Sequence, residues 1–466
     1  MKRPEKTSLT RAISFALGTT ALTTGFLAAA PASAESLIEA LSAAYETNPT
    51  LQAQRAQLRA TDEQVPRALS GWRPNLQAQG SYGVTSTDTT LNSGISSRDD
   101  LRPLSGAVTL SQNLFAGGRT VNATDQAEAS VQSGRQSLLS VEQSTLLNAV
   151  QAYMNVIRDE GVVELNRNNV EVLKRQLDAT TDRFRVGELT RTDTAQSEAR
   201  LSLARSNLIA AEAQLTASRA FYQRVVGQMP GTLEKAVRLE GLPATEDEAR
   251  AFAEQNNPAL MSARYAEEAS REAISVAKGA LLPTFDVQAQ YQYGRDPSTT
   301  IRDVEESSLL GVLTIPLYQS GAEYSQVREA KELNNRSRLQ IYAVQREVDE
   351  AVRNAWEQLR ASRASITSTT EQVNASNIAL EGVRQESEVG ARTTLDVLDA
   401  EQELLNARVA LVSAERDLAV AEYGLLAAMG QLTARDLELP VAYYDPTVNY
   451  GEVRNKWIGF GTAGDE

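Results

Sequence analysis

Two long stretches of this 466-residue chain contain no proline, and this absence limits the possible fold more than any other feature. One stretch lies between Pro103 and Pro230, and the other lies between Pro316 and Pro440. Proline interrupts a helix because it lacks a backbone N–H and its ring clashes with the preceding turn. Both stretches can therefore hold helices much longer than those of an ordinary globular domain.

Each proline-free stretch is predicted to form a helical hairpin. Residues 119–183 and 322–386 could run for roughly 90 to 100 Å at 1.5 Å per residue, turn at Gly187 or Gly390, and return. Apolar residues repeat every seven positions along the second return helix, in rows that include Leu398, Leu405 and Val412, then Leu404, Leu411 and Leu418, and an alanine row from Ala400 to Ala428. Three rows fit either an ordinary bundle core or a helix wedged between two neighbours, as in a tube wall.

The second half of the chain repeats segments of the first half. Matching segments keep an offset of 209 and then, after a loop of different length, of 203: "NPTL" at 48–51 with "NPAL" at 257–260, "RPNLQAQGSYG" from 73 with "LPTFDVQAQYQYG" from 282, "NLFAGG" from 113 with "PLYQSG" from 316, and "RVGELTRTD" from 185 with "EVGARTTLD" from 388. A constant offset over such a length predicts an internal duplication.

Four segments show the period-2 alternation of half-exposed strands. The apolar or small positions are Leu76, Ala78, Gly80, Tyr82 and Val84; Leu104, Gly106, Val108 and Leu110; Phe285, Val287, Ala289, Tyr291 and Tyr293; and Leu309, Gly311, Leu313 and Ile315. Glutamines alternate with them in the first and third segments, and short polar loops are expected at 85–103 and 295–307. Strands of roughly 10 residues can cross a bilayer when tilted. Two surface hairpins on a soluble coiled-coil protein remain an alternative, although they would leave an apolar face uncovered.

The first residues indicate export. Four basic residues, Lys2, Arg3, Lys6 and Arg11, precede an apolar stretch and the small-residue sequence "APASA", so residues 1–34 are predicted to be a secretory signal. Removing these four bases and one acid takes the formal charge from −14 to about −17, which argues against nucleic acid as a partner. Downstream, no apolar run approaches the roughly 18 residues of a spanning helix, so any membrane entry would use strands.

Closing a sheet in lipid requires more strands than one copy has. Unpaired strand edges are not tolerated in hydrocarbon, and single-chain barrels begin at roughly eight strands. Several copies would therefore have to share one barrel.

Asp396 and Asp399 lie one helical turn apart, on one face, at the predicted start of the second return helix. A catalytic dyad, a metal site, a pore ring and ordinary helix-start chemistry are the possible explanations. The chain has no histidine and no cysteine, which excludes triads and thiolate chemistry that need them. No aromatic-rich cleft accompanies the pair, and "AGGR" at 116–119 lacks the spacing of a nucleotide loop. The offset of 203 places Asp193 opposite Asp396 but Gln196 opposite Asp399.

The duplicated halves, the strand ends "NLFAGG" and "PLYQSG" and the turn motifs "VGELTRTD" and "VGARTTLDVLDA" resemble the TolC-like family of outer-membrane efflux and type I secretion tunnels. The resemblance spans essentially the whole mature chain. It implies an α+β membrane protein and a homotrimer, in which four strands per chain form a shared twelve-stranded transmembrane β-barrel continued by a long α-helical barrel. It also implies a passive, non-enzymatic duct without cofactors, docked by a periplasmic adaptor protein and an inner-membrane ABC or proton-driven pump, in contact with outer-membrane lipid.

The resemblance further assigns residues at the turns. Asp396 and Asp399 would form a cation-attracting ring at the periplasmic entrance, and Arg392 would latch it shut by bonding to Asp193 and Thr192. Val186, Gly187, Val389 and Gly390 would contact the adaptor. Ser387 stands where the best-known member has tyrosine, so the closed state either depends more on Arg392 or is latched less tightly.

The expected organisation combines the duplication with this resemblance. A soluble periplasmic scaffold or adaptor is the main alternative function, and the sequence does not separate drug efflux from protein secretion. The expected parts are a signal at 1–34, a first repeat at 35–230 with strands in 72–116 and a helical hairpin at 119–228, an equatorial connection at 231–245, a second repeat at 246–432 with strands in 283–318 and a hairpin at 321–431, and an equatorial tail at 433–466.

Overall fold

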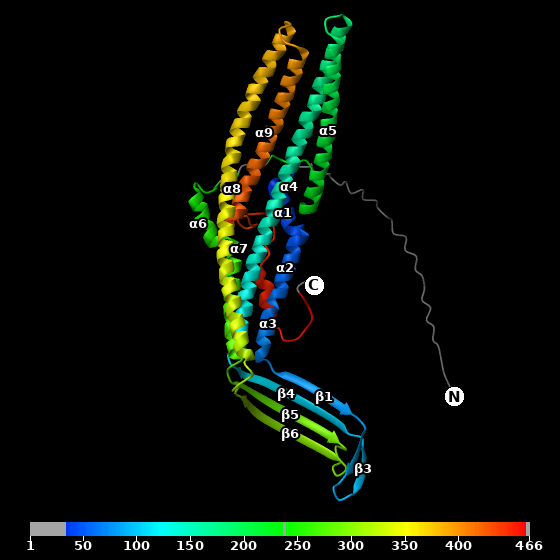
Figure 1. Ribbon diagram of the computed structural model, residues 1–466, viewed down its shortest axis with the longest axis vertical. Helices are drawn as coiled ribbons and strands as arrows, with labels where there is room; N and C mark the ends of the chain where they lie inside the picture. Colours follow the sequence, from blue (N-terminus) through cyan, green and yellow to red (C-terminus); the bar gives the residue numbers. More distant parts are fainter. Residues whose placement is uncertain (1–33, 236–238, 240, 463–466) are drawn as a thin grey trace, which may run out of the picture.

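The computed structural model describes residues 34–235, 239 and 241–462. Figure 1 shows an elongated molecule with a β-sheet at one end and two long helical hairpins that extend away from it. The predicted signal at 1–34 lies outside the described residues except for its last position, and parts of the connection at 231–245 and of the tail at 433–466 also lie outside them.

Four long helices form the two hairpins (Figure 1). Helix α4 (Arg119–Arg185) and helix α8 (Ala322–Glu388) each contain 67 residues, whereas α5 (Arg191–Val226) and α9 (Thr394–Met429) each contain 36. Every boundary in one hairpin differs from its counterpart by 203 positions. Helices α4 and α8 begin after Gly118 and Gly321, whose φ angles are 77° and 81°, and glycine adopts this left-handed conformation without strain. The predicted helix starts at 119 and 322 are those observed.

One sheet joins strands from both halves in the order β1-β4-β5-β6. Its members are β1 (Asn75–Tyr82), β4 (Leu104–Ala116), β5 (Thr284–Arg295) and β6 (Asp303–Thr314), all antiparallel. The register aligns Leu76 with Leu110, Leu110 with Ala289 and Ala289 with Leu309. It also aligns Gln77 with Thr109 and Thr109 with Gln290. Because side chains alternate between faces along each strand, one face is mainly apolar and the other is mainly polar.

The loop expected at 85–103 is instead largely a second hairpin, which corrects the sequence prediction. Strand β2 (Thr85–Thr90) pairs with β3 (Ser96–Leu101) around a turn that contains Gly94. Threonine favours strands, but both faces of this hairpin are polar and most of its residues are exposed. It therefore lacks the apolar alternation that marks the other strands.

Shorter helices lie beside the long helices between the turns and the sheet (Figure 1). They are α1 (Leu37–Thr47), α2 (Pro49–Asp62), α3 (Gln64–Leu69), the 3-10 turn η1 (Ser70–Trp72), α6 (Glu246–Asn256), α7 (Pro258–Gly279) and α10 (Pro446–Arg454). Asn48 and Asn257 cap the helices that start at Pro49 and Pro258, which explains the repeated "NP" motif. The largest apolar cluster joins α1, α2, α4, α5 and the segment after α9, through residues such as Leu41, Leu51, Tyr153, Tyr222 and Leu432.

A parallel bridge between Glu35, just before α1, and Leu233 joins this segment to the connection between the two halves. None of the helices in the described part of the chain combines the length and the apolar character that crossing a bilayer requires.

Candidate functional site

The two helical turns lie at the end of the molecule opposite the sheet (Figure 1). Gly187 and Gly390 make them possible, with φ angles of 83° and 77°. The valines before these glycines are strongly exposed, with Val186 at 79% and Val389 at 81%. All four residues that the resemblance assigns to adaptor contact therefore occupy an accessible tip, and their contact with a partner stays a prediction.

Both return helices start with the same capping box. The Asp193 carboxylate accepts hydrogen bonds from the Thr190 hydroxyl at 2.7 Å and the Thr190 N–H at 2.9 Å. The Asp396 carboxylate accepts from the Thr393 N–H at 2.9 Å and the Thr393 hydroxyl at 2.8 Å. These bonds lower the pKa of each aspartate below its ordinary value. Asp396 thus has a structural role that Asp193 shares.

Asp399 behaves differently because it reaches from one hairpin to the other. Its carboxylate accepts a hydrogen bond from Arg200 on α5 and forms an ion pair with it. The Asp399 side chain is 56% exposed and that of Arg200 is 30% exposed. The corresponding residue of the first hairpin, Gln196, carries no charge. The second aspartate is therefore not explained by helix capping.

A small apolar cluster lies beside this ion pair. Leu398 is only 1% exposed and packs in a cluster with Leu173, Leu201 and Ala204 from the first hairpin. Leu398 and the Arg200–Asp399 pair together join the start of α9 to the α4–α5 hairpin; we call these residues the inter-hairpin contact. Leu398 belongs to the predicted heptad rows, and Leu201 and Ala204 belong to similar rows in the first return helix, but the sequence does not indicate that these two helices meet. Arg200 was missed for the same reason.

Arg392 does not contact its predicted latch partners within this chain. Its Nε donates to the Glu386 carboxylate at 2.8 Å, and this bond raises the pKa of Arg392. The Asp193 carboxylate is occupied by Thr190, and Thr192 is exposed. Ser387 lies beside the turn, where its carbonyl accepts the Gly390 N–H at 3.1 Å. Bonding of Arg392 to Asp193 and Thr192 stays a prediction.

Within the described residues, no group of three or more acidic side chains is arranged to hold a metal ion. A divalent cation such as Ca²⁺ takes about six to eight oxygen ligands. Asp396 and Asp399 of one chain could therefore contribute to such a site only together with other copies.

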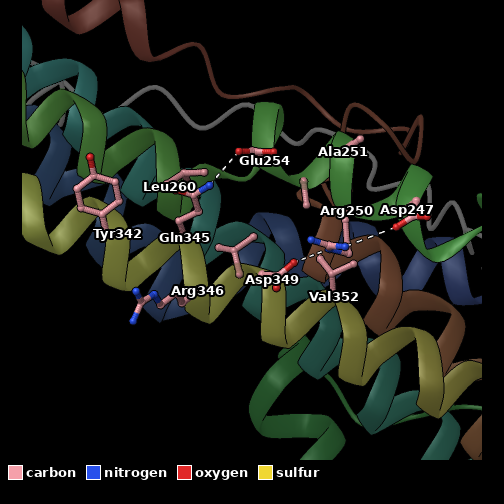
Figure 2. Close-up of a pocket in the computed structure, with 12 residues that line it drawn as sticks. Asp247, Arg250, Ala251, Glu254, Leu260, Tyr342, Gln345, Arg346, Asp349 and Val352 are labelled. Carbon is pink, nitrogen blue, oxygen red and sulfur yellow. Dashed lines mark hydrogen bonds and ion pairs between the residues drawn. The ribbon is translucent and has the colours of Figure 1, made fainter.

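A groove of 480 Å³ lies farther toward the middle of the molecule, between α6 and α8 (Figure 2). Arg250 pairs with Asp349 at 2.5 Å across it, and Gln345 donates to Glu254 at 2.9 Å. Figure 2 shows these pairs bridging the two helices. These polar groups satisfy one another and hold α6 against α8.

Comparisons with known proteins agree with this architecture. The family model for the outer membrane efflux protein matches residues 40–228 and 251–431. The chain is 38% identical over 430 residues to the outer membrane efflux protein BepC of Brucella suis, with 92% of each chain covered. It is 27% identical over 422 residues to the outer membrane protein TolC of Escherichia coli, covering 87% of this chain and 84% of that one. The crystal structure of the Campylobacter jejuni CmeC outer membrane channel superposes with a TM-score of 0.75 at 16% identity, covering 90% and 89% of the two chains.

Proposed function

The chain belongs to the outer membrane efflux protein family, and from this premise we propose how it acts as an exit duct of the outer membrane. Three copies form one continuous channel, with a shared barrel of twelve strands in the membrane and a tube of helices that reaches into the periplasm. The channel is passive, so the energy for transport comes from an inner-membrane pump. The matching helix lengths of the two halves support an internal duplication, which we propose comprises repeats at 35–230 and 246–432 with an equatorial connection at 231–245 and an equatorial tail at 433–466.

The sheet carries the argument for several copies. Strands β1 and β6 are its two edges, and each has a neighbour on one side only. Apolar side chains on the sheet are strongly exposed, including Leu76 at 71%, Tyr82 at 70% and Leu309 at 74%. Pairing β6 of one copy with β1 of the next would satisfy both edges. The apolar face would then meet lipid, and the glutamine-rich face would line a wet interior.

The inter-hairpin contact supports a gate at the far end. In three copies Asp396 and Asp399 would place six carboxylates around the axis, which favours cations over anions. Arg200 pairs with Asp399 in this conformation, so it partly neutralises the ring. Moving α9 away from α4 and α5 would separate Arg200 from Asp399 and expose Leu398. We therefore assign opening to a displacement of the second hairpin relative to the first, with Arg392 bonding to Asp193 and Thr192 in the latched assembly.

Partners follow from the same arrangement. The exposed turns at Val186, Gly187, Val389 and Gly390 would receive a periplasmic adaptor, which links the duct to an ABC or proton-driven pump. The pump selects the cargo, whether small molecules or unfolded protein.

Planar-bilayer conductance of the purified mature protein tests this function directly. A cation-selective channel is expected, and replacing Asp396 and Asp399 together by alanine should reduce both the selectivity and the block by multivalent cations. Protein that partitions with the soluble fraction of cells and gives no conductance would instead indicate the periplasmic scaffold. Unchanged selectivity in a conducting double variant would remove the ring but leave the duct.

A further inference from the structure

The segment after α10 exposes three large apolar side chains in four residues. Trp457 is 64% exposed, Ile458 is 90% exposed and Phe460 is fully exposed at 102%. Contiguous exposed apolar side chains of this kind can mark an interaction site. The main apolar cluster does not include these residues.

This segment is held in place rather than frayed. Arg73 donates from Nη1 to the Lys456 carbonyl at 2.8 Å, and its guanidinium lies 5.1 Å from the centre of the Trp457 ring. Lys456 in turn donates from Nζ to the Gly461 carbonyl at 2.7 Å, and Gly459 turns the backbone with a φ of 124°. Residues 456–461 thus form a small closed loop, the tail loop, with its apolar side chains outward.

The tail loop lies at the junction between the helices and the sheet. Arg73 comes two residues before β1, and the segment that follows α10 lies beside α3, near the sheet (Figure 1). Other exposed apolar residues occur where strands leave the sheet toward the helices: Phe115 at 47%, Leu317 at 91% and Tyr318 at 80%. Exposed apolar side chains therefore occur at this junction both on the strand ends and on the tail loop.

We propose that the tail loop is an interfacial anchor, which inserts into the periplasm-facing leaflet of the outer membrane. This inference rests on the proposed function, because it requires the sheet to lie in the bilayer. Tryptophan and other aromatic residues favour the boundary between acyl chains and headgroups. The Arg73 guanidinium lies against the Trp457 ring and Lys456 directly precedes that residue, so both cations can meet anionic phosphate groups. A phospholipid surface fits a loop that combines exposed apolar side chains with the neighbouring cations of Arg73 and Lys456.

Spin labelling of the full mature chain tests the anchor. The chain contains no cysteine, so Phe460→Cys creates a unique attachment site, and Glu452→Cys on exposed α10 provides a matched control. Both proteins are reconstituted in vesicles of phosphatidylethanolamine and phosphatidylglycerol. At position 460 the label should collide more often with oxygen, which concentrates in lipid, than with a water-soluble nickel complex. At position 452 the preference should be reversed.

Conductance of the same vesicle protein separates the two proposals. A conducting channel with a lipid-exposed label at 460 supports the anchor. A conducting channel whose label collides mainly with nickel overturns the anchor and leaves the duct intact. Low collision with both probes also overturns it, because the tail loop would then be packed against protein. Loss of conductance in the unlabelled parent protein would contradict the duct itself, and with it the anchor.

Discussion

The two helical hairpins use the same turn but differ immediately after it. Thr190 and Asp193 form the capping box of α5, and Thr393 and Asp396 form that of α9. The next turn of α9 carries Leu398 and Asp399, where α5 has Ala195 and Gln196. Leu398 is buried against the first hairpin, whereas Ala195 is exposed. The shared residues build the turn, and the residues that differ determine how one hairpin contacts the other.

Removing the buried side chain should produce the largest effect. Leu398→Ala is expected to destabilise the inter-hairpin contact by about 2 to 5 kcal/mol, as for other buried leucines, and to increase the closed-state current. Hydrogen exchange at the start of α9 measures the loss of protection, and bilayer recording measures the current. Ala195→Ser is the matched change in the first hairpin and should leave both unchanged. Equal effects of the two variants would contradict the asymmetry.

Removing the threonine caps should produce a smaller effect that is equal in both hairpins. Thr190→Ala and Thr393→Ala each delete a hydroxyl that caps a helix, at a cost of about 1 kcal/mol. Faster hydrogen exchange in the first turn of α5 and of α9 would report it. A much larger response at Thr393 would mean that its capping box also carries the gate.

Changing the charge after the turn should alter selectivity more than stability. The Arg200–Asp399 pair is partly exposed, so its contribution to stability is about 0 to 1 kcal/mol. Asp399→Asn leaves Arg200 uncompensated and should lower the cation-to-anion permeability ratio, whereas Arg200→Ala should raise it. Gln196→Glu places a carboxylate at the equivalent position of the first hairpin and should leave the ratio unchanged if only the second hairpin lines the entrance. A ratio that responds to position 196 as strongly as to 399 would refute this difference.

Acid should loosen both turns alike, and only at low pH. The pKa values of Asp193 and Asp396 are lowered from 3.8 in the folded chain. Their stabilising contribution is therefore complete above about 3.8 and is lost as the pH falls through the lower folded values. Amide exchange in the first turns of α5 and α9 should accelerate together in that range, once corrected for the pH dependence of intrinsic exchange. Loosening of one turn near pH 5 would indicate a further titrating group.

Local patterns in the sequence predicted much of this fold. The helix starts at 119 and 322 follow from glycines, and the strands of the four-stranded sheet follow from apolar alternation over about ten residues. Strands β2 and β3 were not predicted, because both faces of their hairpin are polar and show no such alternation.

Less of the candidate site could be predicted from the sequence. The sequence showed Asp396 and Asp399 one turn apart and Asp193 at the position equivalent to Asp396. Arg200 and Asp399, however, are separated by 199 positions, and only the packing of the hairpins brings them together. Arg392 donates a hydrogen bond to Glu386, six positions away on its own hairpin, and the sequence analysis did not anticipate this pair. The proposed ring would need contacts between several copies, and bonding of Arg392 to Asp193 and Thr192 stays a prediction.

The central claim is that several copies share one barrel, because the outer strands β1 and β6 of the four-stranded sheet each have a neighbour on one side only. The number of chains in the particle extracted from the membrane tests this claim most directly. Native mass spectrometry of the mature protein released from detergent should give three times the mass of one chain. A stable, conducting monomer would contradict the shared barrel.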